Sequence, residues 1–396
     1  MFDLKPTKTT AGFILSAALL LSACGGSAAS SPASSPGASS AAAQTVASGA
    51  ASKPAAASAS TKPAAAGSGA TSAKPAGSGA ASAAATGGAP EKTKLQVGIA
   101  APAGSGYMVL RVAADGGYFA KHGLDVTVNT LSASTATQAL ISGQADMYQG
   151  GATAIGARLK GADLIYIAAT VDKNDQMLIG QKGITTWDQL KGKKVATTSP
   201  GAFGEIAMRK TAKERGLTIG TDIQLLYHPT PAAALTTFYS GNADAFILSP
   251  PQSIDAKDKG YPVIIDYYKE GLRIIGPGMV VSGPFYRGNP NTIKAYLEGY
   301  LDGLKRALDD PAYAKSLDMK YNQLTDPKLA DGDYEEGLQQ WNKDMTVNPE
   351  AIQVVLDAID DPAAKTAKTS DFYDNTAIEQ VNKEYGSKLF PNDIKA

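Results

Sequence analysis

Cysteine and histidine are almost absent from this 396-residue sequence, which contains one cysteine, Cys24, and two histidines, His122 and His228. A single cysteine excludes an intrachain disulfide, so the stability of the fold must come from its hydrophobic core. No Cys/His/carboxylate spacing indicates a metal site, and no G-x-S-x-G, Walker-type loop or dinucleotide fingerprint follows an expected strand. We therefore predict no catalytic residues, no metal and no cofactor, which argues against an enzyme.

The sequence also lacks an excess of charge of either sign, with 37 basic and 37 acidic side chains. The first 90 residues hold five Lys and one Asp, so the remainder has 32 basic and 36 acidic residues and a net charge near −4. No basic field suits nucleic acid, and no helical pattern rich in Lys and Arg predicts binding to a membrane surface. Nucleic acid is thus not an expected partner.

The N-terminal region carries an uncharged apolar run, residues 11–23, preceded by Lys5 and Lys8. The run is shorter than the roughly 20 residues needed to span a bilayer, and its pattern is typical of a secretory signal peptide. Its end, LSAC at residues 21–24, resembles the lipobox of bacterial lipoproteins. The resemblance implies cleavage before Cys24, acylation of its thiol, and an extracytoplasmic, membrane-anchored protein. The alternative is an ordinary signal peptide whose cysteine is incidental.

Residues 24–90 contain few residues that could form a core. They are almost entirely Ala, Ser, Gly, Pro and Thr with a few Lys, and Val46 is the only large aliphatic residue. Such a composition predicts a disordered tether, with an r.m.s. reach of roughly 45 Å if it behaves as a flexible coil. Repeated Pro and Gly disfavour the alternative of an Ala-rich helix.

From residue 91, short apolar strands alternate with amphipathic helices, and from residue 289 the pattern is helical only. This alternation predicts an α/β protein with mostly parallel sheets covered by helices. The expected strands are residues 95–100, 124–129, 145–150, 162–170, 193–199, 222–228, 243–249 and 261–267. The expected helices are residues 107–122, 133–143, 153–161, 203–216, 231–240 and 250–259.

Two segments of the chain echo each other. ALISGQADMYQGGAT at residues 139–153 matches TFYSGNADAFILSPP at residues 237–251, each with a helix end, Ser-Gly, a polar residue, Ala-Asp and a strand. The glycine can cap the helix in a left-handed conformation. The echo indicates two similar α/β lobes, and we interpret Asp146 and Asp244 as structural.

The stretch RVAADGGYFAKHGLDVTV at residues 111–128 resembles a signature of the substrate-binding proteins of nitrate/sulfonate/taurine-type ABC importers. These belong to the thiamine-pyrimidine-synthase-like superfamily. Similar motifs follow in the same order: ALISGQAD, AIGARLKGADLIYIAA, DQLKGKKVATTSPGAFGE and NADAFILSPP. The resemblance implies a two-lobe type II periplasmic-binding-protein fold. Its parts would be lobe one at residues 91–183, lobe two at 184–283, and a mainly helical return to lobe one at 284–396.

The resemblance also implies a function. A monomeric, lipid-anchored protein would capture a small molecule between its lobes and deliver it to an ABC permease and ATPase complex. Sulfonates, nitrate, small carboxylates and pyrimidines are carried within the superfamily. The alternative is an exported enzyme or a ligand sensor on the same fold, but the cysteine-rich motif of the pyrimidine synthase branch is absent, since no cysteine follows Cys24.

Ligands of open parallel sheets bind beyond the carboxyl ends of the strands, beside helix N-termini. The loops at these positions are small and hydroxylic, and free N–H groups at helix starts bind anions. The expected ligand-binding residues are Ser105, Tyr107, Ser132, Ser134, Thr135, Gly150, Gly151, Thr153, Ser199, Gly201, Ala202, Phe203, Thr230 and Ser249. Tyr107 and Phe203 could stack on a planar ligand from opposite lobes. The competing interpretation is that these Ser and Thr residues are ordinary helix caps.

Three further side chains could contribute to a ligand site. Arg111 lies one helical turn after Tyr107, and we favour a solvated helix face over a role in pairing with a ligand. His122 is expected at the surface, in the turn KHG. His228 ends a strand, where a position in the cleft is the less favoured interpretation.

Overall fold

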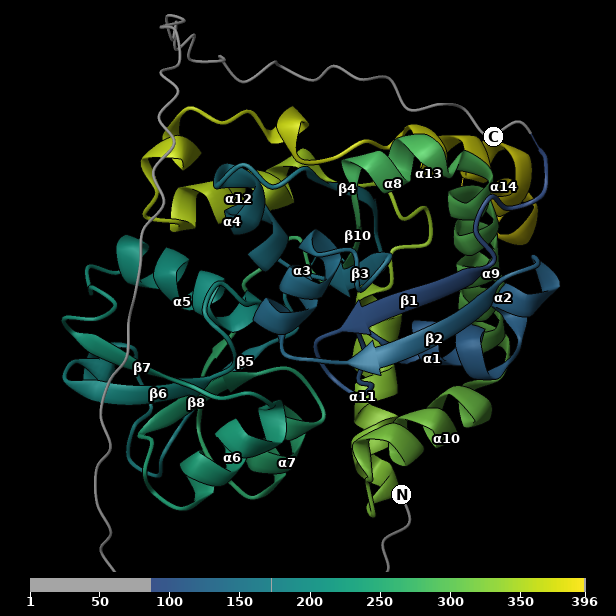
Figure 1. The fold of residues 1–396 in the computed structure, drawn as a ribbon. Coiled ribbons are helices and arrows are strands. Elements are labelled where there is room, and N and C mark those ends of the chain that lie inside the picture. Colours follow the sequence, from purple (N-terminus) through teal and green to yellow (C-terminus); the bar gives the residue numbers. More distant parts are fainter. Residues whose placement is uncertain (1–86, 172, 395–396) are drawn as a thin grey trace, which may run out of the picture. The chain divides into compact units, whose positions relative to one another are not determined.

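Two five-stranded mixed sheets form the two lobes of the computed structural model, which describes residues 87–171 and 173–394 (Figure 1). The first sheet has the order β2 (Asp125–Thr130), β1 (Lys94–Ile99), β3 (Met147–Gly150), β10 (Gly278–Ser282) and β4 (Leu164–Ala169). The second has the order β7 (Ile223–Tyr227), β6 (Lys193–Thr197), β8 (Ala245–Leu248), β5 (Met177–Gly180) and β9 (Val263–Asp266). Cys24, the expected signal peptide and the tether up to residue 86 lie outside the described residues.

One strand in each sheet runs against its neighbours. β10 is antiparallel to β3 and β4, and β5 is antiparallel to β8 and β9, while the other pairings are parallel. These two strands are the first that the chain forms after each crossing between the lobes. The crossings therefore precede β5 and β10, whereas the sequence-based boundaries at 183/184 and 283/284 follow these strands.

The two crossing segments lie side by side and are hydrogen-bonded to each other. The Asn174 N–H donates to the carbonyl of Leu272 at 2.9 Å, and the Gly276 N–H donates to the carbonyl of Val171 at 3.2 Å. Lys173 and Arg273 form an antiparallel bridge between these contacts.

The helices of lobe one begin close to the positions expected from the sequence, with one break. The stretch expected as a single helix over residues 107–122 forms α1 (Met108–Asp115) and α2 (Tyr118–Lys121). The break falls at Gly117, whose φ of 69° is left-handed and cannot continue a right-handed helix. α3 (Ala133–Ile141) and α4 (Thr153–Leu159) complete this part of the lobe.

Lobe two repeats the design with α5 (Phe203–Glu214), α6 (Pro231–Tyr239) and α7 (Gln252–Asp258). The echoed aspartates have equivalent partners. The Asp146 carboxylate accepts from the Gln96 N–H at 2.9 Å, and the Asp244 carboxylate accepts from the Lys194 N–H at 2.9 Å. Each aspartate thus joins two neighbouring strands, which confirms the structural interpretation.

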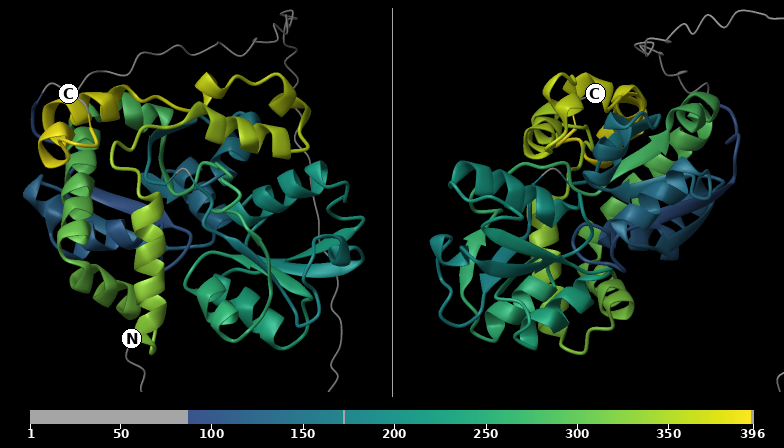
Figure 2. Two further views of the ribbon diagram at one scale, coloured as in Figure 1. Left: turned by 180° about the vertical axis from the view of Figure 1, so that it is seen from behind. Right: turned by 60° about the vertical axis from the view of Figure 1, so that its left-hand side comes forward.

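The C-terminal part of the described chain is helical and reaches both lobes (Figure 2). Its α-helices are α8 (Gly283–Gly288), α9 (Pro290–Asp309), α10 (Pro311–Asn322), α11 (Pro327–Gln340), α12 (Pro349–Ala358), α13 (Thr376–Val381) and α14 (Ser387–Leu389). Short turns of other helix types are Asp188–Leu190, Pro362–Lys365, Thr369–Asp371 and Asn382–Gly386. No helix among the described residues is long and apolar enough to cross a membrane.

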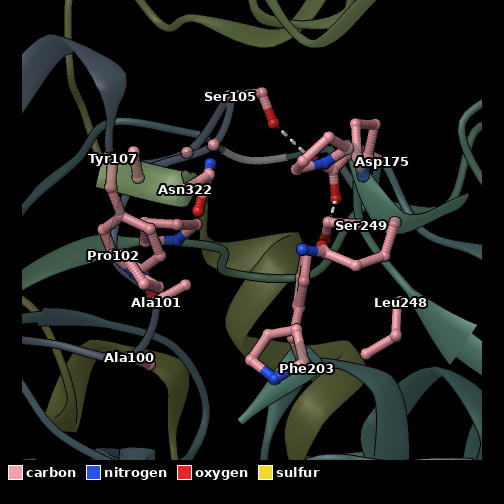
Figure 3. A pocket seen from close by; sticks show the side chains of 18 of the residues that line it. Ala100, Ala101, Pro102, Ser105, Tyr107, Asp175, Phe203, Leu248, Ser249 and Asn322 are labelled. Carbon is pink, nitrogen blue, oxygen red and sulfur yellow. Dashed lines mark hydrogen bonds between the residues drawn. The ribbon is translucent and has the colours of Figure 1, made fainter. Parts of the chain in front are cut away.

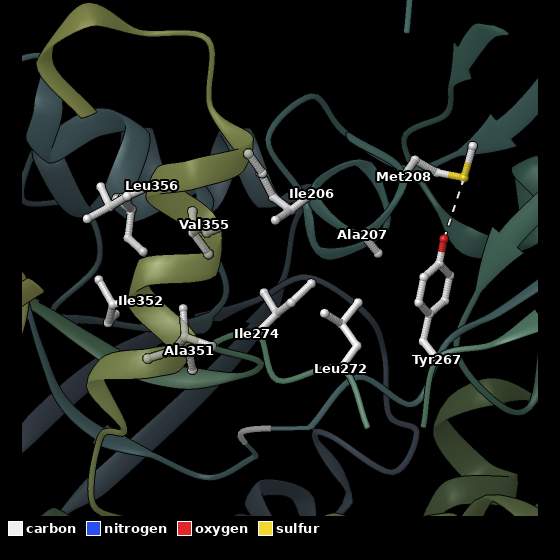
Figure 4. Close-up of a cluster of buried hydrophobic side chains, with 14 of the residues drawn as sticks. Ile206, Ala207, Met208, Tyr267, Leu272, Ile274, Ala351, Ile352, Val355 and Leu356 are labelled. Atoms are coloured by element: carbon white, nitrogen blue, oxygen red, sulfur yellow. Dashed lines mark hydrogen bonds between the residues drawn. The ribbon is translucent and has the colours of Figure 1, made fainter. Parts of the chain in front are cut away.

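The expected packing of these helices on lobe one holds for α9, which lies against α1 and α2, and for α10, which lies against α1. α12 departs from it and packs against α5 of lobe two. The buried side chains of Ile352 and Val355 on α12 belong to the same apolar cluster as Ile206 and Met208 on α5 (Figure 4). The C-terminal segment therefore connects the two lobes, in addition to the two crossing segments.

Candidate ligand-binding cleft

A cavity of about 370 Å³ lies between the lobes (Figure 3). Lobe one contributes the loop after β1, residues 100–107, and the end of α10. Lobe two contributes the starts of α6 and α7, and both crossing segments reach the cavity. We call this cavity the cleft and residues 102–107 the cleft loop. Since both lobes and both crossing segments line the cleft, a molecule bound there would contact both lobes.

Buried carboxyl groups hold the cleft loop from behind. The Gly104 N–H donates to Asp318 Oδ1 at 3.0 Å, and the Ser105 N–H donates to Asp333 Oδ1 at 2.8 Å. Both acids are fully buried and share a hydrogen bond with each other. Burial raises the pKa of Asp318, and burial together with the charge of Asp318 raises the pKa of Asp333 well above its usual range. The raised pKa of Asp333 favours its protonated carboxyl, which can donate to Asp318.

Asp175 lies in the first crossing segment and joins the two lobes through its carboxylate. Its Oδ2 accepts from Ser105 Oγ at 2.7 Å and from Gln340 Nε2 at 3.1 Å, both on lobe one. Its Oδ1 accepts from Ser249 Oγ at 2.7 Å, on lobe two (Figure 3). The side chain is 5 % exposed and lines the cleft. A buried charge with three hydrogen bonds is well supported, and it lies in a segment that connects the two lobes.

Asp175 is not among the residues predicted from the sequence, because those lie in loops at strand ends and Asp175 lies in a crossing segment. The sequence does contain a signal for this position, since the polar run Asn174-Asp175-Gln176 lies between two apolar segments, β4 and β5. Asp318 and Asp333 were missed as well, and they lie on helices far from the cleft loop in sequence.

Aromatic rings line the cleft from both lobes. Tyr107 and Phe203 face it from opposite lobes, and Tyr321 adds a third ring from the end of α10. Burial raises the pKa of the Tyr107 hydroxyl well above its usual value, so this ring carries no charge. The cleft therefore offers apolar, planar surface beside a small number of polar groups, which is typical of small-molecule sites.

The structure corrects the interpretation of Arg111 as part of a solvated helix face. Its side chain is 5 % exposed, donates to the Pro102 carbonyl at 2.8 Å and to Thr130 Oγ1 at 3.1 Å, and lies 3.9 Å over the Tyr321 ring. The guanidinium thus supports the cleft wall from behind. His122 pairs with Glu298 and Asp302, hydrogen bonds that raise its pKa.

The expected ligand-binding residues fall into three groups. Those that line the cleft are Ser105, Tyr107, Gly151, Phe203, Thr230 and Ser249. Those that line a second hollow between the lobes, of about 510 Å³, are Ser134, Thr153 and Gly201. Those that line neither cavity are Ser132, Thr135, Gly150, Ser199 and Ala202.

Members of the last group make local contacts within the fold. Ser132 caps α3 by accepting from the Thr135 N–H at 3.2 Å, as the capping interpretation anticipated. Gly150 lies in β3, where a Cβ atom would collide with the Tyr148 ring. The Ser199 carbonyl accepts from the Ala202 N–H at 3.0 Å in the turn before α5.

The part of the chain that the structure describes has no cluster of metal-binding side chains. No group of three or more His, Cys, Asp or Glu side chains there could hold a metal ion. His228 does not line the cleft.

Comparison with known proteins assigns the family. The NMT1/THI5-like family model matches residues 106–314, more than half of the chain. The chain belongs to this family. It is also similar to YtlA of Bacillus subtilis (strain 168), whose name describes it as a binding protein, with 28% identity over 170 residues. This match covers 41% of the chain, and the chain spans about half, 51%, of this curated relative.

Solved structures share the fold at low sequence identity. A protein from Bordetella bronchiseptica RB50 matches with a TM-score of 0.67 and 22% identity over 75% of this chain and 99% of its own. The alkanesulfonate-binding protein SsuA of Xanthomonas axonopodis pv. citri matches with a TM-score of 0.58 and 18% identity, over 67% of this chain and 91% of its own. The nitrate-binding protein NrtA of Synechocystis PCC 6803 matches with a TM-score of 0.60 and 14% identity, over 77% of this chain and 93% of its own. These matches establish the two-lobe periplasmic-binding-protein fold.

Proposed function

We propose that the protein is the solute-binding component of an ABC importer and is anchored to the membrane through Cys24. The observation that carries this proposal is the cleft, to which both lobes and both crossing segments contribute side chains. Ligand would favour the closed form because it contacts both lobes at once only in that form. The periplasmic binding proteins with the same fold, which bind alkanesulfonates and nitrate, support this function by analogy.

The direct test is to identify what the protein retains. Purified full-length protein would be incubated with a small-molecule extract and washed, and the retained compounds would be measured by mass spectrometry. We expect one or a few compounds, recovered chemically unchanged. Recovery of a converted product would favour the alternative, an exported enzyme. Retention of no compound would contradict the proposed function.

The anchor is tested at its attachment point. Because the cysteine thiol is the group that would be acylated, Cys24→Ser is expected to leave an unlipidated protein that moves from the detergent phase to the aqueous phase on partitioning. A matched change, Ser22→Ala, keeps the cysteine and should leave the protein in the detergent phase. Equal partitioning of wild type and Cys24→Ser would show that the cysteine is not an anchor.

The cleft assignment predicts a loss of affinity on removal of an aromatic ring. Phe203→Ala should weaken binding of the retained compound by about 2 kcal/mol, since that is the gain from burying a ring of this size. Tyr227→Ala is the control, because this ring is 41% exposed on the same lobe and does not line the cleft. Calorimetry on both variants measures the difference. Equal affinity of wild type and Phe203→Ala would place the ligand outside the cleft.

A further inference from the structure

The charge of the cleft differs from what an anion requires. Of the described residues that line it, none is Lys, Arg or His, and Asp175 contributes a carboxylate. Arg111 lies behind the wall and directs its guanidinium to Pro102 and Thr130. Burial raises the pKa of Glu336, on α11, to about 7, and the charge of Asp175 adds to this shift.

Several backbone N–H groups beside the cleft are not available to an anion. In the cleft loop, those of Gly104 and Ser105 donate to the buried acids Asp318 and Asp333. In lobe two, α6 begins at Pro231, which has no N–H group. Pro250 and Pro251 precede α7 and lack one as well. These five positions therefore offer an anion no backbone donor.

Two hydroxyl groups of the cleft are left as acceptors. Ser105 and Ser249 donate their hydroxyl protons to Asp175, so only their oxygen lone pairs are left for a ligand. Gln340 Nε2 also donates to Asp175. The carboxylate and the two serine oxygens therefore favour a ligand that supplies N–H or O–H groups.

We infer that the cleft selects an uncharged or cationic small molecule with a planar apolar body and N–H or O–H donors, and that Asp175 determines this specificity. The inference rests on the proposed function and names its class of solute. The planar body would lie against Tyr107, Phe203 and Tyr321, and the donors would face Asp175 and the oxygens of Ser105 and Ser249. An anion of similar size would meet the Asp175 charge with no cation in the lining to offset it.

A panel with one ring and different charges tests the class. Melting temperature and calorimetry of the full-length protein would be measured at pH about 7.5 with benzamidinium, benzamide, benzoate, benzenesulfonate and nitrate, each up to about 20 mM, enough to detect millimolar affinity. We expect binding of benzamidinium and benzamide, with no detectable binding of the three anions. Added salt should weaken benzamidinium binding and leave benzamide binding nearly unchanged, because only the former involves a charge on the ligand.

The role of Asp175 is tested by removing its charge while keeping its shape. Asp175→Asn should lower benzamidinium affinity by about tenfold, and benzamide affinity by much less, since only the cation loses its Coulomb attraction. Asp258→Asn removes an exposed carboxylate at the far end of α7 and should change neither affinity. If Asp175→Asn fails to fold, the salt dependence in the wild type still reports the charge preference.

The outcomes separate the class of ligand from the function. Tighter binding of any of the three anions than of benzamidinium would overturn the ligand class and leave solute binding intact. Absence of binding by both benzamidinium and benzamide would overturn the ligand class as well. An equal loss for the two compounds in Asp175→Asn would show that Asp175 only supports the site. The proposed function itself fails if the mass-spectrometric experiment finds no retained compound or recovers a converted product.

Discussion

Gly303→Ala is expected to lower the free energy of unfolding by about 3 kcal/mol, although alanine is the better helix former. Gly303 lies in α9 where this helix crosses α1. A Cβ atom at this position would meet the Cβ of Ala113 at 2.5 Å and its Cα at 2.8 Å. Backbone atoms cannot move aside as the end of a flexible side chain can, so the two helices would have to separate. Chemical denaturation of the purified protein measures the change.

A second glycine provides a matched control. Gly156 lies in α4, and a Cβ atom there would have no neighbour within 4 Å. Gly156→Ala should therefore raise the free energy of unfolding by up to about 1 kcal/mol through helix propensity alone. If both variants gain stability, the close contact between α9 and α1 is not present in solution. Since α1 begins directly after the cleft loop, Gly303→Ala should also weaken ligand binding.

Local patterns in the sequence were sufficient for eight of the ten strands of the described chain and for the two-lobe plan. The echoed Ala-Asp pairs predicted equivalent strand entries, and Asp146 and Asp244 occupy them with the same backbone partners. The two antiparallel strands, β5 and β10, were not predicted, because each is an apolar run of four or five residues next to a crossing segment. The break at Gly117 was missed because helical periodicity continues across it, and only the left-handed backbone ends the helix.

The candidate site was predicted only in part, because its polar groups come from distant parts of the chain. Loops at strand ends led to Ser105 and Ser249, but the carboxylate that joins them, Asp175, lies in a crossing segment. Helix caps have the same composition as ligand loops, which is why Ser132 could not be told from a ligand residue. Asp333 is 228 residues from its partner Ser105, and no local pattern indicates such a contact.

Asp333→Ala is expected to cost about 4 kcal/mol of unfolding free energy, because it removes a fully buried group from a connected polar network. The Ser105 N–H would lose its acceptor, and Asp318 would lose the proton donor that stabilises its carboxylate. The cleft loop would lose one of its two buried carboxyl anchors, so ligand binding should fall as well. Thermal and chemical denaturation measure the loss of stability. A loss below about 1 kcal/mol would show that the network contributes little.

Asp333→Asn separates the hydrogen bonds from the proton. The amide can accept from the Ser105 N–H and donate to Asp318 as the protonated acid does, but it does not titrate. The pKa of Asp333 is raised in the folded protein, while the pKa of an Asp in the unfolded chain is about 3.9. Between these two pKa values the folded protein binds one proton more than the unfolded chain. The stability that this proton contributes is therefore complete below the unfolded pKa and is lost as the pH rises towards the folded pKa. We expect Asp333→Asn to gain stability relative to the wild type from acid to alkaline pH, measured by denaturation as a function of pH. Asp258→Asn, at an exposed position, should follow the wild type, and parallel curves for all three proteins would refute the shared proton.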